Sequence, residues 1–321
     1  MAHVTFIHGI ANKPSAGALL DLWLRGLAAA GGPDLPAAGV TSAMVYWADV
    51  LYERPLEAGL AEESLEALEA AGVEPVDLSW RQGESPAERA WTAELGAKLQ
   101  AALAAQEVAT ATSPLDLQEA GPDGNDARDR AESVRLPWFA RERLLETLLR
   151  DAHHYLWNAA HSPRQETPYR VQDEIRRRAV AALASGAGRP GPHVVVGHGM
   201  GAVIAYDCLK RAEGCPGVDA FITLGSPLGL DEIQEKLKPA WTAHDGFPAR
   251  VRGSWINLYD RLDPATGFDP YCAGDFQRAG VAVVRDIHEP SHGRWRHSIA
   301  KYLSGPRFRA RLSTLLGLGG L

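Results

Sequence analysis

The sequence has few cysteines, no excess of positive charge and no long apolar run, and each shortage excludes a class of protein. Its three cysteines, Cys208, Cys215 and Cys272, are an odd number without the spacing of a disulfide framework, which indicates a reducing compartment. A net charge of −7 without a Lys/Arg stripe argues against a nucleic-acid partner. No apolar run approaches the ~18 residues of a membrane helix, and no signal-peptide pattern precedes the first expected strand. We therefore expect a cytoplasmic protein without integral membrane association.

Short apolar runs alternate with helical patterns through most of the chain. The runs are bounded by Gly, Pro or Asp, as buried parallel strands are. They predict strands at residues 4–7, 43–47, 193–196, 220–224, 255–259 and 281–285. Helical patterns lie between them at residues 15–30, 168–185, 200–212, 230–237 and 295–303. This alternation predicts an α/β fold with a doubly wound, mostly parallel sheet that helices cover on both faces.

Residues 53–164 interrupt the alternation, because no convincing strand is found among them. Helical patterns at 55–71, 86–106 and 137–160 accompany a tract at 109–129 that is rich in Thr, Gly, Asp and Pro. We interpret this segment as a helical lid inserted over the carboxyl edge of the sheet, with a loop in the polar tract. Since the insertion is interleaved with the sheet, we expect a single domain over residues 1–321.

The most informative segment is HVVVGHGMGAVIAYD, at residues 193–207. An apolar run, a Gly-rich pentapeptide and a helical pattern predict a strand, a sharp turn and a helix, which is the setting of the nucleophile elbow G-x-S-x-G. Gly199 stands where that motif has its serine, and it cannot attack a substrate. His198 and Met200 flank it as candidate oxyanion or substrate-binding residues, because free N–H groups at the start of a helix favour a developing oxyanion.

A second oxyanion donor is expected after the first strand, in the sequence FIHGI. His8, Gly9 and Ile10 are the candidates there, and the backbone N–H of Gly9 or Ile10 would pair with that of Met200. The alternative is a glycine that serves only the turn.

Asp263 is the candidate acid, because it lies just past the expected strand at 255–259, where a carboxylate can orient a histidine. Asp260 is the alternative, and it is closer to the strand. His297 is the candidate base, after the last expected strand and near the start of a helix, with His292 in a Gly-containing loop as the alternative. The histidine would deprotonate a nucleophile and later protonate the leaving group, while the aspartate holds its tautomer.

These motifs together resemble the α/β-hydrolase superfamily, nearest to its esterase and lipase branch. The His-Gly loop, the elbow G-H-x-M-G and the strand exit T-L-G-S-P-L carry the resemblance, which covers residues 1–50 and about 190–305. The triad of that superfamily has the chain order nucleophile, acid, base. The resemblance therefore implies that Gly199 occupies the nucleophile's place, Asp263 the acid's and His297 the base's. It also implies a small-molecule ester or thioester substrate, no cofactor, no metal and a helical lid over the acyl site.

Three accounts of Gly199 are open. It is an engineered replacement of the serine in a serine hydrolase, or it belongs to a natural pseudohydrolase that binds a ligand or acts as a scaffold, or a water activated by His297 replaces the nucleophile. In each account ester hydrolysis is weak or missing, because the loss of a covalent nucleophile lowers turnover by several orders of magnitude. The sequence indicates no particular oligomeric state.

A remote alternative is dinucleotide binding, since G-x-G-x-x-A at residues 197–202 matches that fingerprint after a strand. The fingerprint needs an acidic residue at the end of the next strand, whereas Asp219 precedes its strand. The histidines His153, His154 and His161 lack a convincing set of acidic or cysteine partners, so we predict no metal site there.

Overall fold

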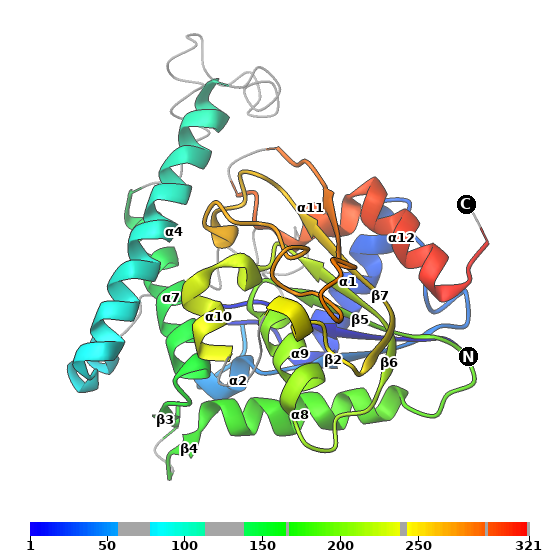
Figure 1. The fold of residues 1–321 in the computed structure, drawn as a ribbon, viewed down its shortest axis with the longest axis horizontal. Coiled ribbons are helices and arrows are strands. Elements are labelled where there is room, and N and C mark those ends of the chain that lie inside the picture. The colour runs from blue at the N-terminus through cyan, green and yellow to red at the C-terminus, as the bar shows by residue number, and fades with distance from the viewer. Residues whose placement is uncertain (57–77, 113–137, 165–166, 238–242, 293–294, 320–321) are drawn as a thin grey trace.

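The computed structural model describes residues 1–56, 78–112, 138–164, 167–237, 243–292 and 295–319. Its centre is a six-stranded sheet in the order β2-β1-β5-β6-β7-β8, in which every neighbouring pair is parallel (Figure 1). The predicted α/β fold class is confirmed, and the sheet is wholly rather than mostly parallel. The strands are β1 (His3–Ile7), β2 (Thr41–Val45), β5 (His193–His198), β6 (Val218–Leu224), β7 (Val251–Tyr259) and β8 (Arg285–His288).

Nine α-helices lie in the described part of the chain, and none of them is both long enough and apolar enough to cross a membrane. They are α1 (Ala16–Ala29), α2 (Ala48–Leu51), α4 (Pro86–Thr112), α7 (Trp138–Leu156), α8 (Val171–Gly186), α9 (Met200–Arg211), α10 (Asp231–Leu237), α11 (Ile299–Ser304) and α12 (Pro306–Leu316). Short 3₁₀ turns are η2 (Leu78–Gly83), η3 (Pro227–Gly229), η4 (Ala243–Asp245) and η5 (Pro264–Thr266).

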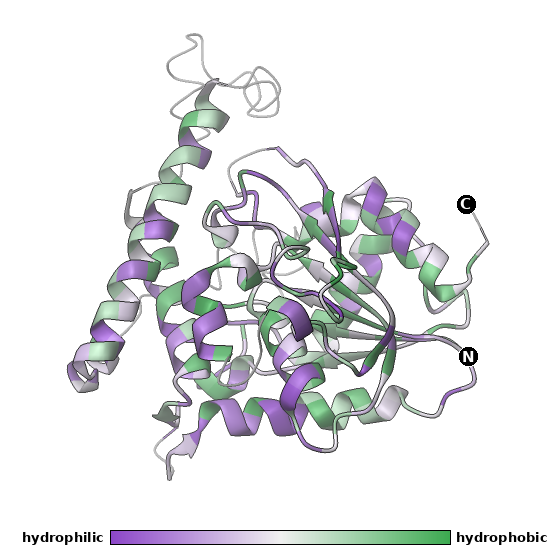
Figure 2. Cartoon of the chain, in the orientation of Figure 1, coloured by the Kyte–Doolittle hydropathy of each residue, from purple (hydrophilic) through white to green (hydrophobic). Residues whose placement is uncertain are grey.

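Helices cover both faces of the sheet because its strands are apolar on both sides. Along β5, Val194 and Val196 belong to one core and Val195 to the other, and all three are fully buried. The first core includes Trp23 of α1 and Phe308 of α12, and the second is closed by α8 and α9. In Figure 2 the strands are largely hydrophobic, and the helices carry both hydrophobic and hydrophilic residues. The layers follow from right-handed connections between parallel strands.

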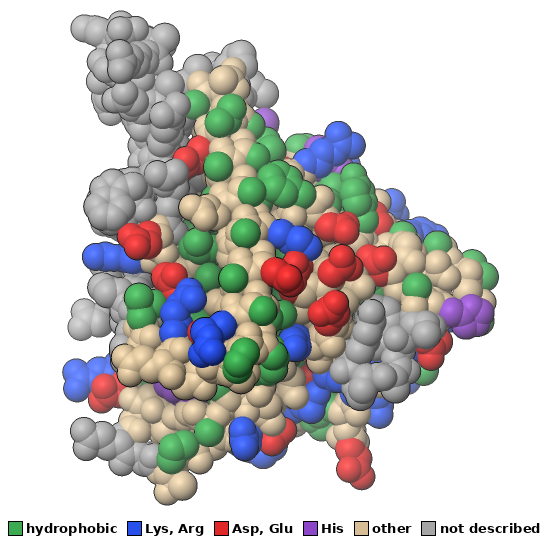
Figure 3. Space-filling view, turned by 60° about the vertical axis from the view of Figure 1, so that its left-hand side comes forward, with side chains coloured by type: hydrophobic (Ala, Val, Ile, Leu, Met, Phe, Trp, Pro, Cys, Tyr) green, Lys and Arg blue, Asp and Glu red, His purple; other side chains and the backbone are tan. Residues whose placement is uncertain are grey.

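The helical insertion, around residues 86–156, lies beyond the carboxyl ends of the strands (Figure 1). Its helices α4 and α7 pack against each other, and α4 is joined to α10 through Glu232. The Trp91 indole donates to the backbone oxygen of Glu232 at 2.8 Å, and Lys98 pairs with the Glu232 carboxylate at 2.8 Å. Figure 3 looks onto this side of the molecule, where small hydrophobic side chains follow the outer face of α4.

The helix predicted at 86–106 is confirmed within α4, and the helix predicted at 137–160 is confirmed over Trp138–Leu156, where α7 ends earlier than expected. The polar tract at 109–129 is helical from 109 to 112, where α4 continues. The remainder of that tract and most of the helix predicted at 55–71 lie outside the described residues. The prediction that no strand occurs there was wrong at one point, because β3 (Ala160–His161) pairs with β4 (Tyr169–Arg170).

Two other predicted elements were displaced. The apolar run at 281–285 is not a sheet strand: Val281 is exposed in an isolated bridge to Arg278, and β8 begins only at Arg285. The helix predicted at 295–303 begins later, at Ile299, because the hydroxyl of Ser298 accepts the Ala300 N–H and caps the helix there.

Asp207 of α9 joins helix α7 of the insertion to the helices α8 and α9, which cover one face of the sheet. Its fully buried carboxylate accepts the Tyr155 hydroxyl of α7 at 2.6 Å and the guanidinium groups of Arg176 and Arg211 at 2.7 Å each. Burial alone would raise the pKa of the Asp207 carboxyl, but hydrogen bonds from Arg176 and the charge of Arg211 bring it below its ordinary value. The carboxylate therefore remains charged and links α7, α8 and α9.

We predict that Asp207→Ala lowers the free energy of unfolding by about 3–5 kcal/mol, because it leaves two arginines and a buried phenol without their acceptor. Urea denaturation followed by circular dichroism measures this loss. Asp21→Ala is the matched control, since Asp21 pairs with Arg25 on an exposed surface of α1 and should contribute about 0.5 kcal/mol or less. Equal losses in the two variants would contradict the linking role of Asp207.

Candidate functional site

Gly199 forms the sharp turn predicted between β5 and α9. Its backbone angles, φ 53° and ψ −123°, lie in a region that residues with a Cβ rarely occupy. Its N–H donates to the Leu224 oxygen at the end of β6, which anchors the turn to the sheet. A Cβ on Gly201 would lie 2.2 Å from the Ile7 oxygen, so glycine there lets α9 start directly against β1. The structure therefore contains the turn of an elbow, with no side chain at its tip.

Asp263 and His297 lie together beside this turn. The Nδ1 of His297 donates to the Asp263 Oδ2 at 2.9 Å, and both side chains are buried. Asp263 also accepts the Tyr302 hydroxyl at 2.7 Å and the Ala265 N–H at 2.9 Å. Burial and the Asp263 charge raise the pKa of Tyr302 well above its ordinary value, so the phenol remains a donor. Because the Nδ1–H of His297 is directed at Asp263, the lone pair of the neutral imidazole is on Nε2.

That Nε2 faces Gly199. A Cβ built on Gly199 would lie 2.7 Å from the Nε2 of His297 and 3.0 Å from its Cε1, closer than ordinary Cβ contacts. The imidazole thus occupies space that a serine side chain would need. A serine at this position fits only if His297 withdraws.

His198 holds the other side of the His297 ring. The two imidazoles stack with 4.4 Å between their centroids, and the Nε2 of His198 donates to the His297 backbone oxygen at 2.9 Å. Burial is the main cause that keeps the pKa of His198 well below its ordinary value, and the charges of His297 and Lys13 lower it further. His198 is therefore neutral. The predicted substrate-binding residue is therefore placed to position His297.

The loop after β1 brings a backbone donor to the site. The Nδ1 of His8 donates to the Gly9 oxygen at 2.7 Å, and its Nε2 accepts the Trp47 N–H at 3.0 Å, so the His8 side chain is engaged within the fold. Burial lowers the pKa of His8 to about 3. Ile10 reaches the cavity beside Gly199 together with Met200. The backbone N–H groups of Ile10 and Met200 donate to no acceptor in the described residues.

The alternative acid and base are not part of the Asp263–His297 pair. Asp260 accepts the N–H and the hydroxyl of Ser291 at 2.6 and 2.8 Å and the Leu262 N–H at 2.8 Å, so it holds a loop rather than a histidine. His292 lines neither of the two cavities next to His297 that are described below. Ser226, in the strand exit after β6, accepts the Leu228 N–H and caps η3.

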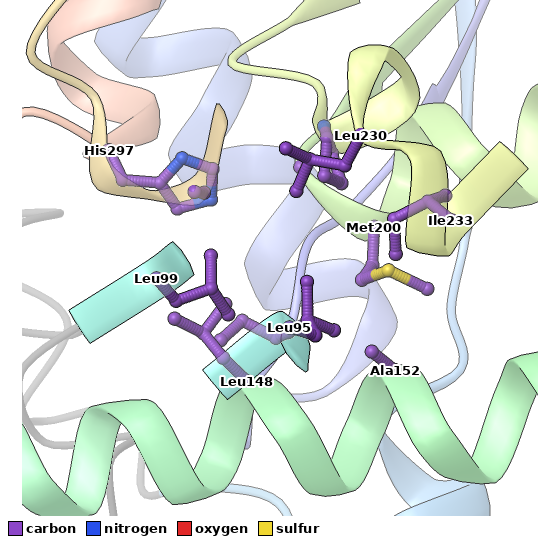
Figure 4. A pocket seen from close by; sticks show the side chains of 12 residues that line it. Leu95, Leu99, Leu148, Ala152, Met200, Leu230, Ile233 and His297 are labelled. Carbon is purple, nitrogen blue, oxygen red and sulfur yellow. The ribbon is translucent and has the colours of Figure 1, made fainter. Parts of the chain in front are cut away.

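A small apolar cavity lies between Gly199, His297 and the insertion (Figure 4). Its volume is about 20 Å³, which is room for about one water molecule. Figure 4 shows His297 and Leu230 on opposite sides of it, with side chains of α4 and α7 closing it from below. Its apolar lining comes from α4 (Leu95, Leu99), α7 (Leu148, Ala152), α9 (Met200) and the η3–α10 segment (Pro227, Leu230, Ile233). A second cavity of about 30 Å³ adjoins His297 on the side of Lys13 and Trp295.

Sequence reasoning missed Tyr302 and the lining residues of the insertion. Tyr302 lies in α11, which follows His297, but a hydroxyl partner for the acid has no sequence signal. The leucines of α4 and α7 belong to ordinary amphipathic patterns, which do not identify the cavity that they close.

The described ranges contain no group of three His, Cys, Asp or Glu side chains that could hold a metal ion. The rings of His154 and His161 are 4.9 Å apart, and His153, next to His154, has one acidic partner, Glu88, at 3.2 Å. Asp219 accepts the His193 N–H at the amino end of β5, opposite the edge where the fingerprint at 197–202 would need an acid.

The fold and these contacts define an α/β protein with a buried Asp–His–Tyr cluster at the carboxyl edge of a parallel sheet. No protein-family model matches the chain, and no curated protein matches its sequence.

We predict that Gly199→Ala lowers the free energy of unfolding by about 1–3 kcal/mol, since it adds a Cβ to a strained turn and against the imidazole. Part of this loss should disappear in the His297→Ala background, where the close contact is removed. A double-mutant cycle by urea denaturation measures the coupling, expected at about 0.5 kcal/mol or more. Strictly additive losses would mean that Gly199 and His297 are not in contact.

Buried histidines make stability sensitive to acid. Burial is the largest cause of a lowered pKa in His3, His8, His154, His193 and His198. Below the unfolded pKa of about 6.5 the unfolded chain takes up protons that the folded protein excludes, so stability is full above that pH and falls toward pH 3–4. His8 alone, with a folded pKa of about 3, should lower the free energy of unfolding by about 2 kcal/mol between pH 7 and 5. Equal unfolding free energies at the two pH values would contradict this.

Proposed function

We propose that this protein is an α/β-hydrolase of the esterase or lipase type, with a site for a carboxylic ester or thioester, in which Gly199 makes turnover weak or absent. The observation that carries the proposal is the orientation of His297. Its Nδ1 is bound to Asp263 and its Nε2 is directed at the tip of the turn between β5 and α9.

The position of the site in the sheet supports the proposal. β1 has β2 on one side and β5 on the other, so the strand order changes direction between β1 and β5. Ligands of open α/β sheets bind at the carboxyl ends of strands at such a point. Gly199 and Ile10 follow the carboxyl ends of these two strands.

The groups present could perform all but one of the tasks of ester hydrolysis. The free amides of Ile10 and Met200 would donate to the substrate carbonyl oxygen, whose charge grows in the transition state. The Nε2 of His297 would take the proton of the attacking group and return it to the leaving alkoxide or thiolate, with Asp263 stabilising the imidazolium. The missing task is covalent attack, which Gly199 cannot perform.

The close approach of His297 to Gly199 favours a second candidate function, a ligand-binding pseudohydrolase. The imidazole lies where a serine would need space, so the site is packed around glycine. In that case the apolar cavity widens to bind the acyl part of a ligand, and the native chain releases the ligand unchanged.

We predict that Gly199→Ser raises the hydrolysis of p-nitrophenyl acetate and butyrate by about 100-fold or more over the native chain, because it supplies the nucleophile at the turn. Release of p-nitrophenol at pH 8 measures the rate. The rate of the variant stays below that of an enzyme with a native triad, because His297 must move aside before the serine fits.

The matched controls identify the base. Adding His297→Ala to the serine variant should return the rate to the level of the native chain. Adding His292→Ala, which lies outside the site, should leave the serine variant's rate unchanged. If Gly199→Ser hydrolyses neither ester faster than the native chain, the hydrolase proposal is wrong. Binding of butyrate by the native chain would then favour the ligand-binding candidate.

A further inference from the structure

The loop after β1 is held by a residue of the insertion, 140 positions later in the chain. The backbone N–H of Ala11 donates to the Oδ2 of Asp151 on α7 at 2.9 Å, and Asp151 is fully buried. Ala11 has a φ of 70°, which is uncommon for a residue with a Cβ and persists only where the surroundings enforce it. The loop conformation therefore depends on a contact with α7.

The Asp151 carboxylate is itself fixed. Arg150 donates to its Oδ1 from Nε and Nη2 at 3.0 and 2.7 Å, and the Tyr52 hydroxyl donates to its Oδ2 at 3.2 Å. The Arg150 guanidinium lies 4.5 Å over the Tyr52 ring. The buried charge is thus compensated and its geometry is rigid, as a positioning group requires.

These contacts determine the direction of the Ile10 N–H. The peptide unit between Ile10 and Ala11 is held at both ends, because Lys13 Nζ donates to its oxygen at 2.7 Å and Asp151 accepts its N–H. The preceding unit is held at the Gly9 oxygen by His8. Since a trans peptide points its N–H opposite to its oxygen, the Ile10 N–H faces away from His8 and has no acceptor in the described protein.

We propose that Asp151 is the positioning residue through which the insertion aims the Ile10 amide at the oxygen of a bound ester or carboxylate. The inference rests on the proposed function, because it gives the Ile10 amide the part of an oxyanion donor. It assigns the insertion a second task besides covering the cavity. Without Asp151 the loop after β1, which carries the Ile10 amide and is here called the donor loop, relaxes, and the site retains only the Met200 amide.

The experiment uses the native Gly199 chain and butyrate as the probe, so it does not depend on turnover. Backbone amide resonances of Ile10 and Met200 are followed by NMR during a butyrate titration. Both should shift downfield in the native chain and in Asp151→Asn, whose side-chain oxygen can still accept from Ala11. In Asp151→Ala only the Met200 resonance should shift. Glu146→Ala, which removes another carboxylate of α7 that pairs with Arg81, is the matched control and should behave as the native chain does.

The outcomes separate the two proposals. If neither amide responds in the native chain, the proposed function fails and the inference fails with it. If Met200 responds but Ile10 does not, or if Ile10 still responds in Asp151→Ala, the positioning role is overturned while the proposed site stands. If Asp151→Ala does not fold, Asp151→Glu replaces it: this variant keeps a charge for Arg150 but displaces the oxygens from Ala11, and it should lose the Ile10 response.

A kinetic readout comes from the serine variant. In that background Asp151→Ala should lower kcat for p-nitrophenyl acetate by about 10-fold or more with KM changed by less than about twofold, because a misdirected oxyanion donor acts on the transition state. Asp151→Asn should restore most of kcat. An unchanged kcat in a folded Asp151→Ala variant would overturn the inference.

Discussion

The parallel pairing of β1 with β5 is the constraint on which the rest of the site depends. It places Ile7 opposite Gly197, so two loops that lie far apart in the sequence leave the same edge of the sheet side by side. α9 can begin at that edge only because Gly201 has no side chain to meet the Ile7 oxygen. The imidazole of His297, the amide of Ile10 and the start of α9 then converge on one small space. A shift of this pairing by one residue would move the Ile10 amide away from the other two.

Local patterns predicted the parts of the molecule that local forces determine. The central strands are short apolar runs between turn residues, and the elbow combines such a run with glycines whose steric roles the structure shows. The run at 281–285 misled because β-branched residues favour a strand only where a neighbouring strand is available, and Val281 is exposed instead. The delayed start of α11 follows from the Ser298 cap, a detail finer than hydrophobic periodicity.

The candidate site was predictable in its residue types but not in its supports. Asp263 and His297 follow strands at the edge where such groups gather, and the structure brings them to 2.9 Å. The choice of Asp263 over Asp260 could not come from spacing, since both lie past the same strand. It depends on which carboxylate the Tyr302 hydroxyl and the Ser291 loop engage, and these partners meet only in the folded chain. Asp151 lay in a segment without any motif.

The contacts of the insertion divide it into two mechanically different halves. α7 is bound through buried charges, to Asp207 by Tyr155 and to the loop after β1 by Asp151, so moving it would expose unpaired polar groups and dismantle the donor loop. α4 meets the cavity through Leu95 and Leu99, and it is tied to α10 by Trp91 and by the pair of Glu232 with Lys98, whose side chain is 41% exposed. Separating α4 therefore breaks an ion pair that water already reaches, whereas separating α7 exposes carboxylates that are fully buried. A guest larger than a single water should accordingly displace α4 before α7.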